Sequence, residues 1–500
     1  MIQKITFLFF TVFSLVLSAQ TVNIEGDPYA GNPYATITDA IAASTNAADV
    51  ILITGIHTEP ITIDKSITIR GTDPLTDIIQ AAASAVSNGA GSRAISISEG
   101  AFTINIENLG VRYGNDPENG GGVNIDKVTG FVTLNNVIIE ENYTAKNGGG
   151  IGVAGSNANI VKCIIRNNSS ALDGGGMIAA PNNGSGINST VNLTQSLIFN
   201  NLGRNGGGIY INGNNNFGND YLIDVNIENS TISTNSAFSA SGGNGGGAIF
   251  SASFPWTSNT SVGNVTLKLV HATVYNNTHA ALNKSGLQFG SGAATNLSAF
   301  NSIIVSFGDD VATKALNFAN SNTTDVVNCI LGGLNAPPLA IIDDVAKNNQ
   351  KGRTANQSGL TGALTDEGGN TLVMAITDGS AADDYCTAAT GETIPTIDQR
   401  GFNREGINDA GAFEFAGTLS TSNSISGGLD VRIFPNPAND LVKISGVLNI
   451  DLVRVYSILG TLEKVVYSQK EIDVSDLSSG LHMMEIQSEG QKTVKRIIIK

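Results

Sequence analysis

The chain has 500 residues, and Asp and Glu outnumber Lys and Arg by 43 to 27, which gives a net charge of −16. An acidic chain without a basic stripe argues against binding to nucleic acid or to anionic membrane surfaces. Only 14% of the residues are charged and 6% are aromatic, while glycine occurs 58 times. This composition is typical of a glycine-rich β protein and not of a helical enzyme.

Residues 1–19 have the pattern of a secretory signal peptide. Lys4 supplies the positive charge, Phe7 to Leu17 form the apolar core, and a small-residue site predicts cleavage between Ala19 and Gln20. The apolar core is too short to span a bilayer. No later run reaches eighteen apolar residues, so the sequence predicts an exported chain without a transmembrane segment.

The first part of the exported chain predicts a cap for a stack of strands. Residues 34–44 have the pattern of a short helix, inside a cap that we place at about residues 33–46. Alternating segments at 49–53, 61–63 and 67–69 indicate strands. This order resembles the start of pectin-lyase-like β-helices, where a helix covers the open first coil. A cap is physically expected, because bare strand edges template aggregation.

Between Ile106 and Leu334 one unit recurs at intervals of 26 to 42 residues. It contains two aliphatic residues five positions apart, usually an Asn three positions later, and in five units a glycine triplet before an apolar-x-apolar pair. A period of this size with variable insertions is typical of a solenoid, whose units bury a core only by stacking on one another. The two-residue apolar period indicates strands. The sequence therefore predicts a parallel β-helix.

Glycine and asparagine recur at positions that we assign to the corners of the coils. Glycine accepts a positive φ and close backbone approach, and Asn tolerates the left-handed backbone. Asn side chains in successive coils can also hydrogen-bond along the stack. Lys162, Gln195 and His271 interrupt the Asn series. The assigned positions, interpreted as turn and ladder residues and not as a ligand site, are Asn108, Asn136, Asn229, Asn301, Asn328, Gly120, Gly148, Gly174, Gly206 and Gly245.

These repeats resemble those of polymorphic outer-membrane proteins and other pectin-lyase-like surface proteins over roughly residues 106–290. The resemblance implies a right-handed β-helix and carries no activity with it. Insertions at 181–189, 212–221 and 237–244 leave the coils at similar phases, which predicts loops on one side of the solenoid. Trp256 lies in a further insertion. We interpret it as a side chain that folds back onto the coil, and stacking on a sugar ring is the alternative.

Three cysteines, Cys163, Cys329 and Cys386, exclude a closed disulfide framework. Cys163 and Cys329 occupy the place in the repeat where other units have serine, such as Ser196. They are therefore predicted as small, buried residues. They lack metal-ligand spacing, and no metal or cofactor is predicted.

After Leu334 the repeat fades, and a terminal block follows at about residues 360–415. Its motifs GGNTL (368–372), DGSA (378–381), DQRGFNR (398–404) and DAGAFE (409–414) resemble the terminal block of the choice-of-anchor family of bacterial β-helix surface proteins. Ala381 and Ala410 stand where that family usually has Pro and Ile. The block also contains charged residues that look like an active site but are predicted to close the last coil with ion pairs: Asp398, Arg400, Arg404, Asp409 and Glu414.

Residues 418–428 form a Ser/Gly-rich linker, and residues 429–500 form a separate module predicted as a small β-sandwich. The module resembles the C-terminal sorting domain of the type IX secretion system of Bacteroidota, although His482 stands where an aromatic residue is usual. The resemblance implies recognition by an outer-membrane translocon, sortase-like removal of the tail, and release or attachment to surface lipopolysaccharide. The positions that carry it are Pro435, Asn436, Pro437, Asp440, Gly460, Leu477, Gly480 and Lys495.

Many β-helices cleave or de-esterify acidic polysaccharides, but no catalytic constellation is visible in this sequence. Hydrolysis needs paired carboxylates. Asp309-Asp310 resembles the paired-Asp motif of polygalacturonases, without the companion motifs of that family. A calcium-dependent lyase needs clustered acidic ligands and a base, which the coils lack. The scattered histidines are His57, His271, His279 and His482.

The prediction for the whole chain is an all-β protein, with a right-handed parallel β-helix at residues 20–417 followed by the small sandwich. Its predicted role is that of an exported, adhesin-like or glycan-binding surface protein without enzymatic activity. The alternative is a polysaccharide lyase or glycoside hydrolase of the pectin-lyase-like superfamily.

Overall fold

The chain forms two compact units, residues 1–419 and residues 420–500. The computed structural model describes residues 20–25, 34–182, 187–213, 222–239, 245–252, 264–280, 286–289, 295–305, 314–317, 321–335, 342–415, 418–419, 431–445, 450, 452–457, 462–467, 469–488 and 491–500. The predicted signal peptide, Trp256, the Asp309-Asp310 pair, most of the predicted linker and Gly460 lie outside these ranges.

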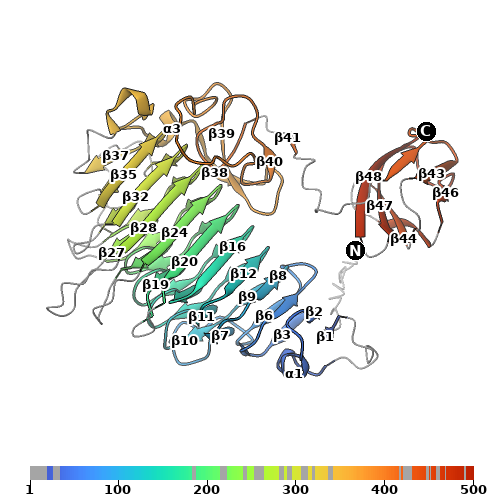
Figure 1. Cartoon of the computed structure of the whole chain (residues 1–500), viewed down its shortest axis with the longest axis horizontal. Coiled ribbons are helices and arrows are strands. Elements are labelled where there is room, and N and C mark those ends of the chain that lie inside the picture. The colour runs from blue at the N-terminus through green and yellow to red at the C-terminus, as the bar shows by residue number, and fades with distance from the viewer. Residues whose placement is uncertain are drawn as a thin grey trace, which may run out of the picture. The chain divides into compact units, whose positions relative to one another are not determined.

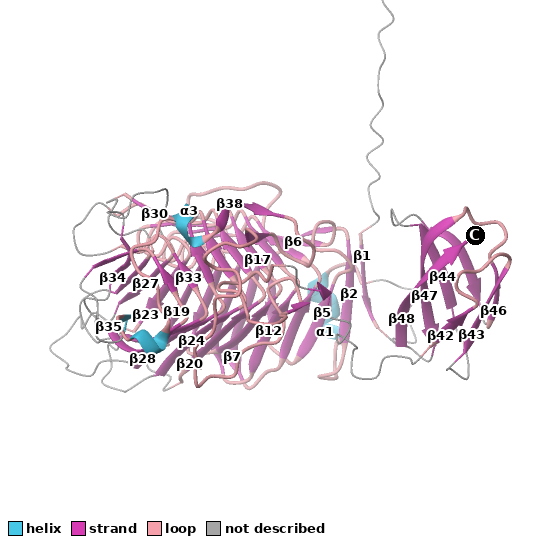
Figure 2. Ribbon diagram, turned by 90° about the horizontal axis from the view of Figure 1, so that it is seen from above, coloured by secondary structure: helices cyan, strands magenta, loops and turns pink. Residues whose placement is uncertain are grey.

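The first unit is a solenoid whose coils pass in turn through sheets that we name A, B, D and C (Figures 1 and 2). Strands of successive coils pair in parallel, as Leu134 does with Ile106 and Ile160. In the described part of these sheets, the antiparallel exception is β1 with β2 at the N-terminal edge. The predicted parallel β-helix is confirmed.

Sheets A and B provide the first two strands of each coil. Sheet A consists of β1 (Thr21–Ile24), β2 (Val50–Thr54), β5 (Ile67–Arg70), β8 (Ile104–Glu107), β12 (Phe131–Asn135), β16 (Asn157–Val161), β20 (Ser189–Thr194), β24 (Leu222–Glu228), β28 (Asn264–Val270), β32 (Thr295–Phe300) and β35 (Ser321–Val327). Sheet B consists of β3 (Ile56–Thr58), β6 (Ile78–Gln80), β9 (Gly110–Arg112), β13 (Ile138–Glu140), β17 (Ile164–Arg166), β21 (Leu197–Phe199), β25 (Thr231–Ser233), β29 (Thr273–Tyr275), β33 (Ile303–Ile304) and β36 (Ile330–Leu331).

Sheets D and C complete the coil. Sheet D consists of β10 (Asn115–Asp116), β14 (Tyr143–Thr144), β18 (Ser169–Ser170), β22 (Leu202–Gly203), β26 (Ser236–Ala237) and β30 (Thr278–His279). Sheet C consists of β4 (Ile61–Ile63), β7 (Ile95–Gly100), β11 (Val123–Val128), β15 (Ile151–Ala154), β19 (Met177–Ala180), β23 (Ile209–Asn212), β27 (Ile249–Ala252), β31 (Leu287–Phe289), β34 (Lys314–Asn317) and β37 (Gly333–Asn335).

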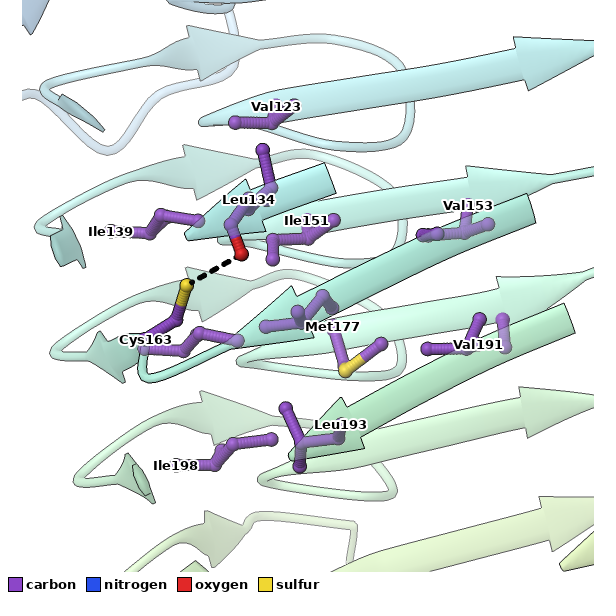
Figure 3. Close-up of a cluster of buried hydrophobic side chains, with 14 of the residues drawn as sticks. Val123, Leu134, Ile139, Ile151, Val153, Cys163, Met177, Val191, Leu193 and Ile198 are labelled. Carbon is purple, nitrogen blue, oxygen red and sulfur yellow. Dashed lines mark hydrogen bonds between the residues drawn. The ribbon is translucent and has the colours of Figure 1, made fainter. Parts of the chain in front are cut away.

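The core lies inside the coils and is built from one side of each strand. In β24, Ile223, Val225 and Ile227 are buried, and the residues between them are half-buried. This is the two-residue period of a strand with one face in the core. Val225 pairs with Val191 one coil earlier, so inward side chains form continuous rows that run through the solenoid. Figure 3 shows part of this core.

The core cysteines lie in these rows, as predicted. Cys163 and Cys329 are fully buried, and their thiols are free. The Cys163 Sγ lies 3.3 Å from the Leu134 carbonyl oxygen (Figure 3). The Cys163 backbone N–H donates to the Ser196 Oγ of the next coil at 3.0 Å, which shows that serine and cysteine are equivalent in the repeat.

At the corner between sheets A and B, each repeat coil turns through a residue with a left-handed backbone. The φ angle is 54° at both Asn108 and Asn136, and the Asn136 amide donates to Asn108 Oδ1 at 2.9 Å. The side chains that interrupt the Asn series adopt the same backbone, because the turn is set by the coil and not by the side chain. The residues with this conformation are Asn108, Asn136, Lys162, Gln195, Asn229, His271, Asn301, Asn328 and Asn348.

The glycine corner precedes sheet C, and its φ angles lie between 60° and 78°. In the coil of β27 this conformation falls on Gly246 and not on Gly245, because Ala248 takes the place of the third glycine in the triplet. The assignment of Gly245 as the corner residue is therefore wrong by one position. The corner is also tight, since a Cβ on Gly207 would lie 2.4 Å from the Ser236 carbonyl oxygen.

A buried ladder of asparagine amides runs along the corner between sheets B and D. In each step, the backbone N–H and the Nδ2 of one Asn donate to the Oδ1 of the Asn in the next coil, at 2.9–3.1 Å. Each Nδ2 also donates to a backbone carbonyl of the preceding coil. The members of this ladder are Asn142, Asn168, Asn201, Asn235 and Asn277.

Helix α1 (Ile37–Ala43) lies within the predicted cap segment. The side chain of its N-cap residue Thr36 accepts from the Asp39 N–H at 3.0 Å. Ile37, Ala40 and Ile41 are buried and belong to the same core as the coils. The helix therefore covers apolar side chains of the first coil that would otherwise face water.

The long insertions leave the solenoid at two phases. The described ends of 181–189 and 212–221 connect sheet C to sheet A, whereas 237–244 connects sheet D to sheet C. The prediction of one common phase is wrong, because 237–244 precedes the glycine corner and the other two insertions follow it.

Residues 342–415 follow the last full coil. They contain the short 3₁₀ helix η2 (Val345–Lys347), α3 (Ala355–Ser358), the antiparallel hairpin β38 (Leu360–Thr365) and β39 (Val373–Ile376), and β40 (Phe402–Asn403), which pairs with β41 (Thr418–Leu419). Their apolar side chains form a second core with Tyr275, Ile303 and Ile330 of the solenoid.

The second unit contains two antiparallel sheets around its own core, as in the predicted sandwich. One sheet has β42 (Arg432–Phe434), β43 (Leu441–Ser445) and β46 (Glu471–Asp473). The other has β45 (Leu462–Tyr467), β44 (Leu452–Ser457), β47 (Gly480–Ser488) and β48 (Gln491–Ile499). Asn436 of the predicted sorting motif donates to the Arg496 carbonyl oxygen at 2.8 Å and accepts from the Ile498 N–H at 2.9 Å, so the motif is tied to the last strand.

Candidate functional site

The terminal block lies along the flank of the solenoid (Figure 1). Its hydrogen bonds to corner residues place it over the corner between sheets A and B. Gln195 Nε2 donates to the Asp398 carbonyl oxygen at 3.2 Å. Asn328 exchanges two hydrogen bonds with the backbone of Ala388, at 2.9 and 3.0 Å. The predicted ion pairs among the charged residues form, but they lie over earlier coils, next to Gln195 and Asn229, and do not close the last coil. We call the left-handed residues at the corner between sheets A and B, from Asn108 to Asn348, the corner row. Their side-chain amides face outward on successive coils, and the backbone of the block hydrogen-bonds to them.

A buried ion pair anchors the block to this row. Arg404 Nη1 lies 2.8 Å from Glu414 Oε2, and their side chains are 1% and 3% exposed. Arg404 Nη2 also donates to Asn229 Oδ1 at 2.9 Å and to the Gly411 carbonyl oxygen at 3.1 Å. Removing one partner of such a pair leaves an uncompensated buried charge, at a cost of about 3–5 kcal/mol. The pair therefore has a structural role.

Arg400 has a comparable position. Its Nη2 lies 2.7 Å from Asp398 Oδ2, and the side chains are 6% and 0% exposed. The guanidinium carbon lies 4.2 Å from the ring centroid of Phe402 and 4.0 Å from that of Phe413. These contacts use both the charge and the flat face of the guanidinium, so Arg400 holds the inside of the block together.

Three carboxylates of the block, those of Asp383, Asp384 and Asp409, lie within 4.8 Å of one another. Burial raises the pKa of Asp409 to about 7. Asp409 Oδ1 already accepts from the Asp384 N–H at 2.7 Å, and Asp383 Oδ2 accepts from the Gly379 N–H at 2.7 Å. The cluster is thus part of the turn structure.

A pocket of about 290 Å³ is lined by residues of sheet B, of the loop after β5 and of the block. We call it the flank pocket. The outer face of β13, β17 and β21 contributes Ile138, Ile164 and Phe199. The loop after β5 contributes Leu75, which is 65% exposed. The lining consists of Asp73, Pro74, Leu75, Ile138, Ile164, Arg166, Phe199, Asp366, Gly369, Asn370, Thr371 and Leu372.

The loop between β38 and β39 forms part of the pocket wall and is fixed at two points. Gln399 Nε2 donates to Thr371 Oγ1 at 2.8 Å, and Gln399 Oε1 accepts from Thr231 Oγ1 on sheet B at 2.6 Å. Asn370 Nδ2 donates to Asn136 Oδ1 at 3.1 Å. The wall therefore rests on sheet B and on the corner row.

Gly369 is required for this fit. Its φ is 92°, and a Cβ there would lie 2.7 Å from the Arg400 Cα. The loop after β5 is fixed in a different way, because the buried Asp77 accepts from the Thr72 N–H at 2.6 Å and from the Gly55 N–H at 2.9 Å. Both loops are thus held by contacts within the protein, one by a close backbone approach at Gly369 and the other by the Asp77 carboxylate.

The polar groups of the pocket are few. Arg166 Nη2 lies 2.7 Å from Glu140 Oε2. Asp73 Oδ1 accepts from the Leu75 N–H at 2.9 Å, and Asp366 Oδ1 accepts from the Gly368 N–H at 3.1 Å. Two carboxylates, one paired cation and the polar side chains of Asn370 and Thr371 therefore surround an apolar floor.

Few of the residues singled out in the sequence lie at this pocket. Asn136 supports its wall, and the GGNTL motif supplies Gly369 to Leu372. Sequence reasoning missed the floor and the β5–β6 loop, because their residues come from coils that only the fold brings together. The periodicity did contain one signal, since Ile138, Ile164 and Leu197 continue an apolar row on the outer face of sheet B, where water-facing residues are expected.

Comparison with known proteins gives two matches of different weight. Residues 432–500 match the family described as the secretion system C-terminal sorting domain. The chain is also similar to the crystal structure of pectate lyase Pel9A, with 15% sequence identity and a TM-score of 0.45 over 75% of this chain and 90% of that chain. A similarity of this degree carries no information about activity. No curated protein matches the chain.

The sorting domain decides where the protein goes. It implies handling by the secretion machinery, and among the residues that the structure describes no helix is long and apolar enough to cross a membrane. The C-terminal module is a type IX secretion sorting domain, and the chain is a secreted or cell-surface protein built on a parallel β-helix.

Proposed function

We propose that this protein is a non-enzymatic, adhesin-like surface protein that binds the end of a glycan in the flank pocket. The make-up of the pocket carries the proposal. An apolar floor with one aromatic ring and a few polar side chains is the usual composition of a small-molecule site. The volume of about 290 Å³ lies at the lower limit of such sites, roughly 300–1,000 Å³, which suits a sugar residue better than a long chain.

Delivery to the surface uses both ends of the chain. Residues 1–19 are removed between Ala19 and Gln20 during export from the cytoplasm. The outer-membrane translocon then recognises the sorting domain, and a sortase-like protease removes it. The β-helix is released or attached to surface lipopolysaccharide. Detecting Gln20 as the first residue of the surface protein, and a C-terminus before residue 429, would test this sequence of events.

Glycan binding is tested with the mature protein on an oligosaccharide array, followed by titration calorimetry on any ligand found. Phe199→Ala is expected to weaken binding at least tenfold, because it removes the aromatic part of the floor. Phe131→Ala is the matched control, since Phe131 is 42% exposed and does not line the pocket. Equal affinities of the two variants would refute the assignment of the pocket.

Hydrolysis of a glycan is the second candidate, because Asp73 and Asp366 both line the pocket and glycosidases use two carboxylates. Each of these carboxylates accepts a hydrogen bond from its own loop, as turn-forming Asp residues do. This favours a role for both residues in stabilising turns over a role in catalysis. Incubation with a panel of polysaccharides decides the matter. Product that is lost in both Asp73→Asn and Asp366→Asn would replace the binding proposal with the hydrolase.

A further inference from the structure

The charges around the flank pocket bear on the class of sugar that it takes. All of its lining residues are described, and Arg166 is the sole cation among them. Asp73 and Asp366 contribute two carboxylates at the same pocket. A ligand carboxylate placed between these groups would meet like charges, which is unfavourable unless a free cation compensates.

Arg166 does not provide that compensation. Its Nε donates to Glu140 Oε2 at 2.8 Å, and its Nη2 lies 2.7 Å from the same oxygen. The two side chains are 30% and 21% exposed, so the pair is partly withdrawn from water. Turning Arg166 towards a ligand would leave the Glu140 carboxylate without its partner. The cation is therefore already neutralised within sheet B.

The remaining features favour hydroxyl groups and an apolar ring face. A carboxylate accepts hydrogen bonds but donates none when ionised, so Asp73 and Asp366 match sugar hydroxyls. Phe199, Ile164 and Leu75 offer a surface against which the C–H face of a pyranose can pack. We infer that the flank pocket selects neutral sugars and rejects uronic acids, an inference that rests on the proposed glycan binding.

The experiment compares neutral and acidic ligands of equal length on the mature protein. Cellotriose, mannotriose and galactotriose are titrated beside trigalacturonate and trimannuronate, at 10 mM and 150 mM NaCl. At least one neutral trisaccharide is expected to bind, and its Kd should change less than twofold between the two salt concentrations. The acidic trisaccharides are expected to have Kd values at least tenfold higher than the neutral ones at 10 mM NaCl. This difference should shrink at 150 mM NaCl, because salt screens the repulsion.

Two variants locate the selectivity. The double variant Asp73→Asn/Asp366→Asn removes both carboxylates. It is expected to reduce the ratio of the Kd for the acidic ligand to the Kd for the neutral ligand at least fivefold. The control, Asp224→Asn, removes a carboxylate on sheet A and should leave the preference unchanged. Tighter binding of the uronates, or an unchanged preference in the double variant, would overturn the inference while leaving glycan binding in place. Failure of both ligand classes to bind would instead refute the proposed function on which the inference rests.

Discussion

Replacing Asn201 by alanine tests how strongly the buried amide ladder stabilises the solenoid. Asn201 is 1% exposed. Its Nδ2 donates to the Ile165 carbonyl oxygen at 2.9 Å and to Asn235 Oδ1 at 2.9 Å. Its Oδ1 accepts from the Asn168 N–H at 3.0 Å and from Asn168 Nδ2 at 3.1 Å. Alanine removes these bonds while keeping the backbone.

The expected cost follows from the groups left behind. The Asn168 N–H loses its acceptor and the Ile165 carbonyl loses a side-chain donor, both away from water. A buried polar group without a partner costs about 1–3 kcal/mol. The space left by the amide adds a cavity term of about 24 cal/mol per Å³. We therefore expect Asn201→Ala to lower the free energy of unfolding by about 4 kcal/mol.

The neighbouring Asn200→Ala provides the control. Asn200 is exposed, has a φ of 54° and donates to Asn167 Oδ1 at 2.6 Å. Alanine there loses a solvent-exposed bond and strains the left-handed turn, for about 1 kcal/mol. Urea unfolding of the mature protein, followed by far-UV circular dichroism, measures both variants. If the two variants lose the same free energy of unfolding to within about 1 kcal/mol, burial of the ladder does not stabilise the solenoid, and the reasoning is refuted.

Three further predictions concern the core, the flank and the tail. Cys163→Ser should lower the free energy of unfolding by only about 1 kcal/mol, because Ser196 fills the same place one coil later. Burial raises the pKa of the wild-type thiol to about 12, so the thiol should resist iodoacetamide in the folded protein. Rapid alkylation would contradict this. Burial, followed by the charge of Arg404, lowers the pKa of His271 well below its usual value, so the folded protein keeps the ring neutral while the unfolded chain takes up a proton as the pH falls below about 6.5. The free energy of unfolding should then fall on acidification, by up to about 2 kcal/mol at pH 5. His271→Asn, which restores the ladder residue, should reduce this loss in melting curves recorded between pH 7 and pH 5. If the variant loses as much stability between these pH values as the wild type, His271 is not the source of the loss. Deleting residues 429–500 should leave the thermal unfolding of the β-helix nearly unchanged but strand the protein in the periplasm, and normal surface display of the truncated chain would contradict the sorting role.

The sequence is sufficient to predict the coils because each unit repeats the same local physics. Alternating aliphatic residues set the strands, and Asn or Gly marks a left-handed turn. The repeat alone therefore places Asn108 and Asn136 at one corner. It misplaces Gly245 by one position, because a run of three glycines carries no internal register and Ala248 replaces one of them.

The position of the terminal block cannot be predicted in the same way. Its motifs are local, but its contacts join residues about 200 positions apart, such as Gln195 with Asp398. The interruptions of the Asn series do not mark the docking places. Gln195 and His271 contact the block, His271 Nδ1 at 3.2 Å from the Gly411 carbonyl oxygen. Asn229 and Asn328, which keep the series, contact it as well.

The block also explains why a pocket exists on a sheet that should otherwise be closed or polar. Sheet B has an apolar row on its outer face, and Leu197 and Ile303 in that row are fully buried. A solenoid face of this kind needs a cover. Ile164 in the same row is only half-buried, and it lines the flank pocket together with residues of the β38–β39 loop. The same apolar row that docks the block therefore supplies the floor of the flank pocket, so the pocket lies at the margin of a structural interface and its floor residues keep their places in the repeat.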